Sequence, residues 1–181
     1  MAIWQLRTAP ADKFAPLAPT EAQAMAGIFE ARGKPLQWKR RPKVSVLQEP
    51  KKKAALPRAD VSLLMSGALV LNQKAEDILG PFLKEFGQLL ELDVSGATEY
   101  FYNVTNVIDC IDPDRSEKRS TGVILKEVFR EGATPIEPAL FKDPRTVGTR
   151  MYVNSAAKAQ IDSIVNVAGL AGLEFVELGT R

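Results

Sequence analysis

The chain has 181 residues, of which 45% are hydrophobic and 25% are charged. This length suits one sizeable hydrophobic core better than two domains, and the composition excludes a chain that is disordered throughout. The single cysteine, Cys110, excludes an internal disulfide, and the chain contains no histidine. The sequence therefore predicts one globular domain over residues 1–181.

The sequence also lacks the two patterns that direct a chain out of the cell or into a membrane. Residues 1–7 show no basic stretch followed by an apolar run. No window approaches the roughly 18 uninterrupted apolar residues that a transmembrane helix needs. We therefore expect a cytoplasmic protein.

The net charge is +2, but the charges are unevenly distributed. Residues 1–58 contain 12 Lys or Arg and 4 Asp or Glu, whereas residues 59–181 contain 12 and 18. Most of the basic excess lies in residues 34–58, which we call the basic segment. Such a segment can attract nucleic acid or an acidic protein face. It can equally be a solvated loop whose lysines keep an edge strand from pairing with other chains.

Two strands and a short helix are expected in the first quarter of the chain. An aromatic strand is predicted at 3–6. Thr20 and Gln23 have the spacing of a capping box, which predicts a helix over 21–31. A second strand is predicted at 43–48, where valines alternate with polar residues.

The next part of the chain predicts a linker followed by short elements. Residues 51–57 are basic and end in proline, which is typical of a linker. Asp60 can cap a single helical turn over 61–65. A strand is predicted at 68–71.

A helix and a β-hairpin are expected in the middle of the chain. Asn72 is predicted to start the helix, and Pro81 to kink or break it. Residues 89–94 then alternate between the two faces of a strand. The turn at 95–98 returns the chain into a partner strand at 99–103.

Near the C-terminus, Asn154 can cap a helix that ends near Gly169, and an alternating strand follows at 173–178. Further strands are expected at 106–110, 123–129 and 150–153. Few helices and many short strands, without a regular strand–helix repeat, predict an α+β fold. We expect a single domain with mostly antiparallel short strands and two or three helices.

The sequence offers no set of residues for catalysis. Without histidine, the Ser-His and Cys-His nucleophile pairs and the commonest metal ligand are excluded. Cys110 lies in a predicted strand, where a buried, unreactive thiol is typical. The spacing of Gly27 and Gly33 does not match a phosphate-binding loop, and Pro35 stands where that loop needs Ser or Thr. We therefore predict a protein that is not an enzyme and that has no cofactor or metal ion.

One group of acidic residues remains, and we call it the acidic turn: Asp109, Asp112, Asp114 and Glu117. Carboxylates can hold a hard cation, but proline and arginine interrupt this run and no glycine supplies the sharp turn of a calcium loop. Aspartates are also common in turns, where they accept backbone hydrogen bonds. The third interpretation is an acidic patch that binds a partner, with Asp112 and Asp114 both exposed.

Short structural segments follow one another in a characteristic order over roughly 150 residues. They are the turn at 33–38, the strand with Val44 and Val46, the segment 60–62 that leads to the strand at 68–71, the strand at 89–92, the segment 102–105 with Asp109 and Asp112 after it, the segment 141–144, and the segment 169–175. In this order they resemble the immunity proteins of bacterial polymorphic toxin systems, in the group numbered eleven among the predicted immunity families.

The resemblance implies an antitoxin that binds a cognate toxin of the same cell and neutralises it by covering its active site. Such toxins are often nucleases, whose substrate-binding faces are basic, so the acidic turn would complement them and speed their encounter. The alternative is a nucleic-acid-binding module that uses the basic segment. That segment contains no known reader motif, and Trp38 is its only aromatic residue.

Overall fold

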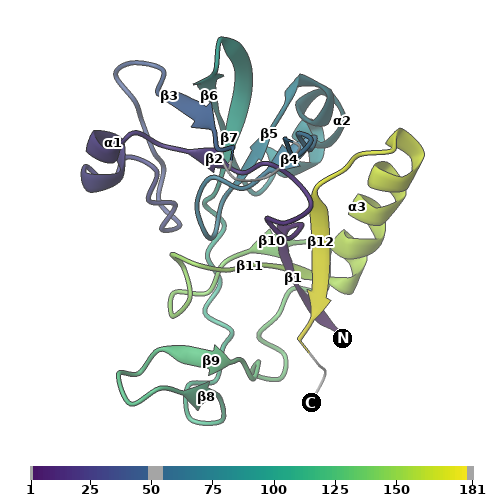
Figure 1. Ribbon diagram of the computed structural model, residues 1–181. Helices are drawn as coiled ribbons and strands as arrows, with labels where there is room; N and C mark the ends of the chain where they lie inside the picture. The colour runs from purple at the N-terminus through teal and green to yellow at the C-terminus, as the bar shows by residue number, and fades with distance from the viewer. Residues whose placement is uncertain (1, 49–54, 179–181) are drawn as a thin grey trace.

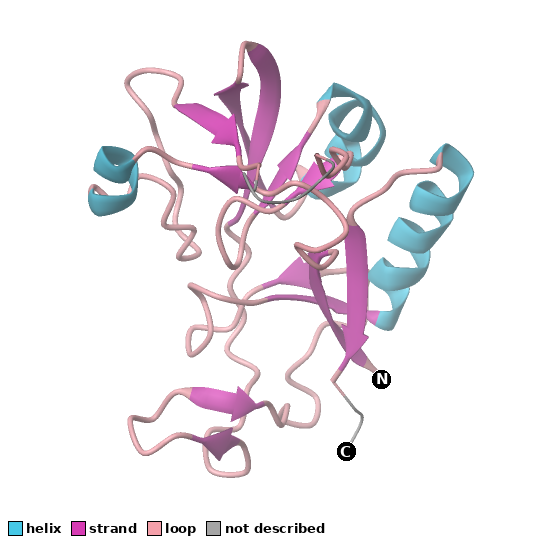
Figure 2. Cartoon of the chain, in the orientation of Figure 1, coloured by secondary structure: helices cyan, strands magenta, loops and turns pink. Residues whose placement is uncertain are grey.

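Twelve strands and three helices lie in residues 2–48 and 55–178, the part of the chain that the computed structural model describes. The strands form a six-stranded sheet, a four-stranded sheet and a separate two-stranded hairpin (Figure 1, Figure 2). The predicted α+β fold with mostly antiparallel short strands is confirmed. None of the helices in these ranges has the length and apolar character needed to cross a bilayer.

The six-stranded sheet is built around one long hairpin. In spatial order its strands are β2 (Leu17–Ala18), β3 (Lys43–Val46), β6 (Gly87–Val94), β7 (Ala97–Val104), β5 (Leu69–Leu71) and β4 (Val61–Ser62). Only the pairing of β3 with β6 is parallel. β6 and β7 are joined by Ser95 and Gly96, whose φ angles of 52° and 93° suit a two-residue hairpin turn. The predicted alternation is confirmed, because Leu92 and Val94 are both buried.

The four-stranded sheet brings the two ends of the chain together. Its strands are β10 (Leu140–Phe141), β11 (Met151–Asn154), β1 (Ile3–Thr8) and β12 (Leu173–Glu177), and all of them are antiparallel. β1 lies between β11 and β12, with Leu6 opposite Phe175. The strands predicted at 3–6, 150–153 and 173–178 are therefore confirmed.

Three helices accompany the sheets: α1 (Glu21–Met25), α2 (Gln73–Leu83) and α3 (Ser155–Ala168). Both predicted asparagine caps are present, since Asn72 accepts the N–H of Ala75 and Asn154 accepts the N–H of Ala157, each at 2.9 Å. α3 ends at Gly169, whose φ of 61° is left-handed and favours glycine.

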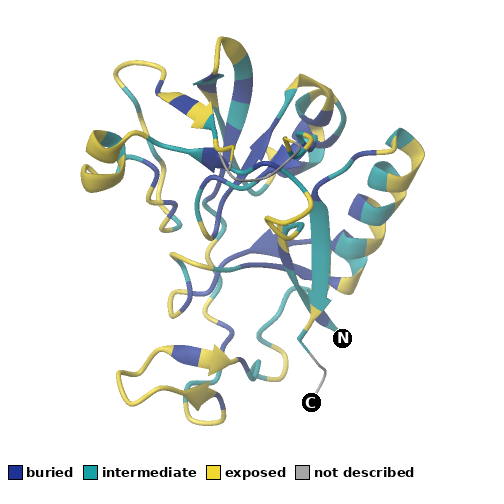
Figure 3. Ribbon diagram, in the orientation of Figure 1, coloured by how far each residue is buried: buried dark blue, intermediate teal, exposed yellow. Residues whose placement is uncertain are grey.

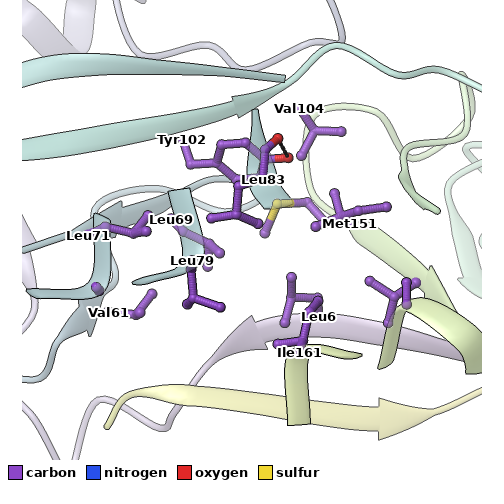
Figure 4. Packing of buried hydrophobic residues seen from close by; sticks show 14 of the residues in the cluster. Leu6, Val61, Leu69, Leu71, Leu79, Leu83, Tyr102, Val104, Met151 and Ile161 are labelled. Carbon is purple, nitrogen blue, oxygen red and sulfur yellow. Dashed lines mark hydrogen bonds between the residues drawn. The ribbon is translucent and has the colours of Figure 1, made fainter. Parts of the chain in front are cut away.

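The main hydrophobic core lies where both sheets meet α2 and α3 (Figure 4). Leu6 and Met151 come from the smaller sheet, Leu69 and Tyr102 from the larger one, and Ile161 from α3. Each buried leucine or isoleucine stabilises the fold by about 1.5–3 kcal/mol relative to the same side chain in water. The core is not entirely apolar. The hydroxyl of Tyr102 donates to the carbonyl of Leu83 at 2.8 Å, which Figure 4 marks with a dashed line.

Two smaller clusters cover the outer faces of the sheets. Phe29, Val70, Leu92 and Phe101 pack with Trp38 on the larger sheet. On the smaller sheet the buried members are Ile3, Cys110, Ile111, Ala139, Phe141 and Tyr152. Figure 3 shows buried positions in both sheets and exposed positions in the connecting loops.

Two predicted elements are wrong because distant residues determine the local structure. The helical turn expected after Asp60 is replaced by β4. The Asp60 carboxylate instead accepts the side-chain N–H of Asn72 at 3.0 Å and the N–H of Ala171 at 2.9 Å. The strand expected at 106–110 is a loop with one bridging residue, Val107.

Three predicted elements differ in extent. The capping box of Thr20 and Gln23 is present, but α1 ends at Met25 instead of residue 31. The break predicted at Pro81 is absent, since α2 continues through Pro81 and ends two residues later at Leu83. The strand expected at 123–129 is limited to β9 (Ile124–Lys126). Of the predicted linker, residues 51–54 lie outside the described residues.

Candidate partner-binding surface

Residues 110–130 form a projecting element that we call the hairpin arm. It begins where Ile111 bridges Phe129 and where the N–H of Asp112 donates to the carbonyl of Val128 at 2.7 Å. Further out, β8 (Glu117–Lys118) pairs with β9 in a two-stranded sheet. Figure 1 shows this hairpin standing apart from both larger sheets, and Figure 3 shows that most of it is exposed.

The arm is attached to the smaller sheet through one buried carboxylate. Glu127 is 2% exposed at its side chain and accepts from the guanidinium of Arg150 and from the hydroxyl of Tyr152, the latter at 2.7 Å. Arg150 also donates to the carbonyls of Ile124 and Leu125 at 3.4 and 3.2 Å. Burial and the neighbouring Glu127 charge raise the pKa of Tyr152, so this hydroxyl stays a donor. The base of the arm is thus fixed by charged hydrogen bonds.

Asp109 of the acidic turn lies at the base of the arm and is neutralised there. Its carboxylate pairs with the guanidinium groups of Arg145 and Arg130, the latter at 2.8 Å. The hydrogen bonds from Arg145 and Arg130 lower the pKa of Asp109. With two cations beside it, Asp109 contributes little negative potential to the surface.

Asp112 matches the turn interpretation of the acidic residues, although it was expected to be exposed. It is half-buried instead of exposed, and its carboxylate accepts the N–H groups of Asp114 at 3.0 Å and Arg115 at 3.2 Å. Its own carbonyl accepts the hydroxyl of Ser116 at 2.5 Å. This arrangement is an Asx turn, in which the aspartate side chain replaces a backbone acceptor. Asp112 therefore positions the start of β8.

Asp114 and Glu117 are exposed, and neither forms an ion pair with any described residue. Of the four predicted residues, Asp109 and Asp112 thus organise the arm, whereas the charges of Asp114 and Glu117 remain available to a partner. Arg115, Lys118 and Arg119 are exposed in the same arm. The surface therefore carries charges of both signs and is not uniformly acidic.

A cavity of about 640 Å³ lies between the arm and the paired ends of the chain. Glu117, Arg115 and Phe129 line it from the arm, and Ile3 and Leu178 line it from the smaller sheet. Ile136, which is 79% exposed, also borders it. Val123 and Leu125 add exposed apolar side chains on the arm itself. Apolar side chains beside unpaired charges are typical of surfaces that bind other proteins.

The buried ionisable groups nearby are used to hold the backbone. Lys142 is fully buried, and its ammonium donates to the carbonyls of Ala31 and Val147. Burial lowers the pKa of Lys142 to about 8. The carboxylate of Asp143 accepts the N–H groups of Cys110 and Ile111, both at 2.8 Å.

None of these groups lines the cavity beside the arm. Burial raises the pKa of Cys110 to about 12, so this thiol is not a nucleophile at neutral pH. Within residues 2–48 and 55–178, no group of three or more Asp, Glu or Cys side chains is arranged to hold a metal ion. Lys142, Asp143 and Cys110 therefore stand away from the cavity, and Glu127, which does line it, is held by Arg150 and Tyr152.

The basic segment is partly engaged in the fold. Arg58 binds the carboxylate of Glu99 at 2.7 Å, and Arg41 donates to the hydroxyl of Thr98 at 2.9 Å. Residues 49–54 of this segment lie outside the described residues. Arg41 and Arg58 are therefore less available to a binding partner than the sequence suggests.

No family model matches this chain, and no curated protein matches it. The resemblance to immunity proteins of polymorphic toxin systems therefore stays a prediction. The functional interpretation depends on the geometry of the hairpin arm and on the chemistry of the side chains around it.

Proposed function

We propose that this protein is an immunity protein, which binds a cognate bacterial toxin and neutralises it by covering the toxin's active site. The observation that best supports the proposal is the hairpin arm. The arm projects from the fold, exposes Val123, Leu125 and the charge of Asp114, and presents the charge of Glu117 beside a cavity. These features favour binding to a protein surface over a role in the core.

In this proposal the four residues of the acidic turn have two kinds of role. Asp109 and Asp112 position the arm through Arg130, Arg145 and the Asx turn. Asp114 and Glu117 face the toxin and complement the basic substrate-binding surface of a nuclease. The complex would bury about 1,200–2,000 Å² in total, with a few apolar side chains contributing most of the affinity.

The alternative, a nucleic-acid-binding module based on the basic segment, has weaker support. Arg41 and Arg58 are held by the acidic side chains of Glu91 and Glu99. A module of that kind needs many free cations that follow a phosphate backbone, and aromatic faces on which bases can stack. Among the described residues of the basic segment, only Lys34, Lys39 and Arg40 form no ion pair, and the ring of Trp38 packs against Phe29 and Phe101.

We expect a toxin domain to be encoded beside this protein's gene, and the test uses that domain. The Asp114→Lys and Glu117→Lys double variant should associate with that toxin at least about tenfold more slowly at low salt, since exposed charges act mainly on the association rate. Its association rate should also depend less on ionic strength. Stopped-flow or surface-based kinetics at several salt concentrations measure both effects.

The matched control reverses two exposed acidic residues outside the arm, with Asp12→Lys and Glu21→Lys. This variant has the same net charge as the first and should associate at nearly the wild-type rate. Equal slowing in both variants would show that only total charge matters and would contradict the proposed surface. A wild-type protein that neither binds the toxin nor protects cells from it would contradict the proposed function itself.

A further inference from the structure

Two hollows share Trp38 in their linings, and neither is lined by a residue of the hairpin arm. They measure about 610 and about 440 Å³. Trp38, Gln37 and Arg41 line both. The smaller one, which we call the basic hollow, has apolar walls from Ile28, Trp38 and Pro42 and cationic side chains from Lys39, Arg40, Arg41 and Lys43.

The apolar wall of the basic hollow is held rigidly. The indole N–H of Trp38 donates to the carbonyl of Ile28 at 2.9 Å. The Trp38 ring packs edge-on against Phe29, with centroids 5.5 Å apart, and against Phe101 at 5.6 Å. A preformed wall lowers the entropic cost of binding because few side chains must be ordered.

The cations of the hollow differ in their availability. Arg41 lies 3.5 Å from the carboxylate of Glu91, and Lys43 lies 3.8 Å from that of Asp93. Lys39 and Arg40 are exposed and form no ion pair within the described residues. Two unpaired cations therefore stand beside a preformed apolar wall.

We propose that the basic hollow binds an acidic segment of a partner protein. One apolar side chain of that segment contacts Trp38, Ile28 and Pro42, and carboxylates on either side of it pair with Lys39 and Arg40. This site is separate from the hairpin arm and does not depend on toxin binding. The protein would then have a second interaction surface, which binds an acidic partner, whereas the hairpin arm binds a basic one.

The geometry favours a protein segment over nucleic acid for two reasons. Base stacking needs an open aromatic face, whereas Trp38 is half-buried and its ring packs against Phe29 and Phe101. Tight binding to nucleic acid also needs several phosphate contacts, and among the described residues of this hollow only Lys39 and Arg40 form no ion pair. A short segment with two or three carboxylates matches this charge better.

The probe is a short acidic peptide in which one phenylalanine is flanked on both sides by glutamates. The chain contains two tryptophans, so a Trp4→Phe variant leaves Trp38 as the only indole. Titration of this variant should change the Trp38 emission saturably. A peptide with serine in place of phenylalanine should bind about tenfold more weakly, because it buries less apolar surface.

The variant Lys39→Glu with Arg40→Glu, in the same Trp4→Phe background, should weaken peptide binding at least about tenfold at low salt. The control Lys13→Glu with Arg119→Glu changes the net charge equally, at exposed residues outside the hollow, and should bind as the parent does. An absent response to the peptide, or an equal loss in both variants, would overturn the proposal. A single-stranded oligonucleotide that binds more tightly than the peptide would overturn it in favour of nucleic acid.

Discussion

Lys142 and Asp143 are neighbours in the chain, and each fixes a different loop. The Lys142 ammonium is hydrogen-bonded to the carbonyls of Ala31 and Val147, and the Asp143 carboxylate holds the N–H groups of Cys110 and Ile111. A buried charge is costly unless such partners surround it. The pair therefore links the loop before the hairpin arm to two other parts of the fold.

Lys142 should make stability depend on pH. Because burial lowers its pKa from 10.5 to about 8, the unfolded chain binds a proton between these pH values that the folded chain does not. The free energy of unfolding should therefore rise as the pH increases from about 8 to 10.5, by at most about 1.4 kcal/mol per pH unit. The protein loses the same free energy of unfolding as the pH falls back towards 8. Urea unfolding of the wild type and of Lys142→Met over this range measures the effect as a difference.

The comparison with Lys142→Met is needed because other buried groups titrate in the same range. Burial raises the pKa of Cys110, Tyr102 and Tyr152, so these groups weaken the fold as the pH rises. They are present in both proteins and cancel in the difference. Lys39→Met, at an exposed position, serves as the control. A difference between wild type and Lys142→Met that is constant with pH would contradict the prediction.

At the scale of single elements, the hairpin arm is stable only through its attachment. β8 and β9 contain two and three residues, and an isolated hairpin of that size is marginal in water. Its few buried side chains include Ser116, Ile124 and Glu127. The ion pair of Glu127 with Arg150 therefore adds to the backbone pairing of residues 110–112 with 128–130 in orienting the arm.

Replacing Arg150 with methionine leaves the Glu127 carboxylate buried without its cation. We expect this change to lower the free energy of unfolding by about 3 kcal/mol or more. Arg150→Met combined with Glu127→Met should recover much of that loss, because the uncompensated charge is gone. Denaturant unfolding measures stability, and hydrogen exchange of the arm's amides measures local opening.

Arg115→Met is the control for this prediction, since Arg115 is exposed and has no ion pair among the described residues. It should change neither stability nor exchange appreciably. If the single Arg150 variant and the double variant are equally destabilised, the charge of Glu127 is not the cause. The arm would then be oriented mainly by its backbone pairing with residues 110–112.

At the scale of the whole molecule, the two proposed surfaces lie at a distance from each other. The basic hollow adjoins α1 and β3, whereas the hairpin arm projects from beneath the smaller sheet (Figure 1). The main core between them joins both sheets through α2 and α3. The two surfaces share no lining residue.

The whole molecule should show no catalytic turnover. The chain has no histidine, and its one thiol has a pKa of about 12. Nuclease and hydrolase assays with and without divalent metal ions should give rates equal to those of a heat-inactivated sample. Metal-dependent cleavage that disappears on Asp114→Asn would contradict this prediction, and the acidic turn would then be catalytic.

Local interactions allowed much of the fold to be predicted from the sequence. The capping box at Thr20, the caps at Asn72 and Asn154 and the stop at Gly169 each involve residues three or four positions apart. The alternation in β6 and β12 likewise follows from the two-residue period of a strand. Such features form in much the same way wherever the element lies, so the α+β class and the presence of the main helices and strands could be predicted.

Only the tertiary structure decided the chemistry of the candidate site. Asp109 is neutralised by arginines 21 and 36 residues away, and Asp60 holds a backbone N–H 111 residues away. Glu127 and Arg150, which anchor the arm, carry no local pattern that links them. A charged side chain acquires its role from the partners that folding brings beside it. For that reason the sequence could indicate the acidic turn, whereas the fold determined which of its carboxylates remain available.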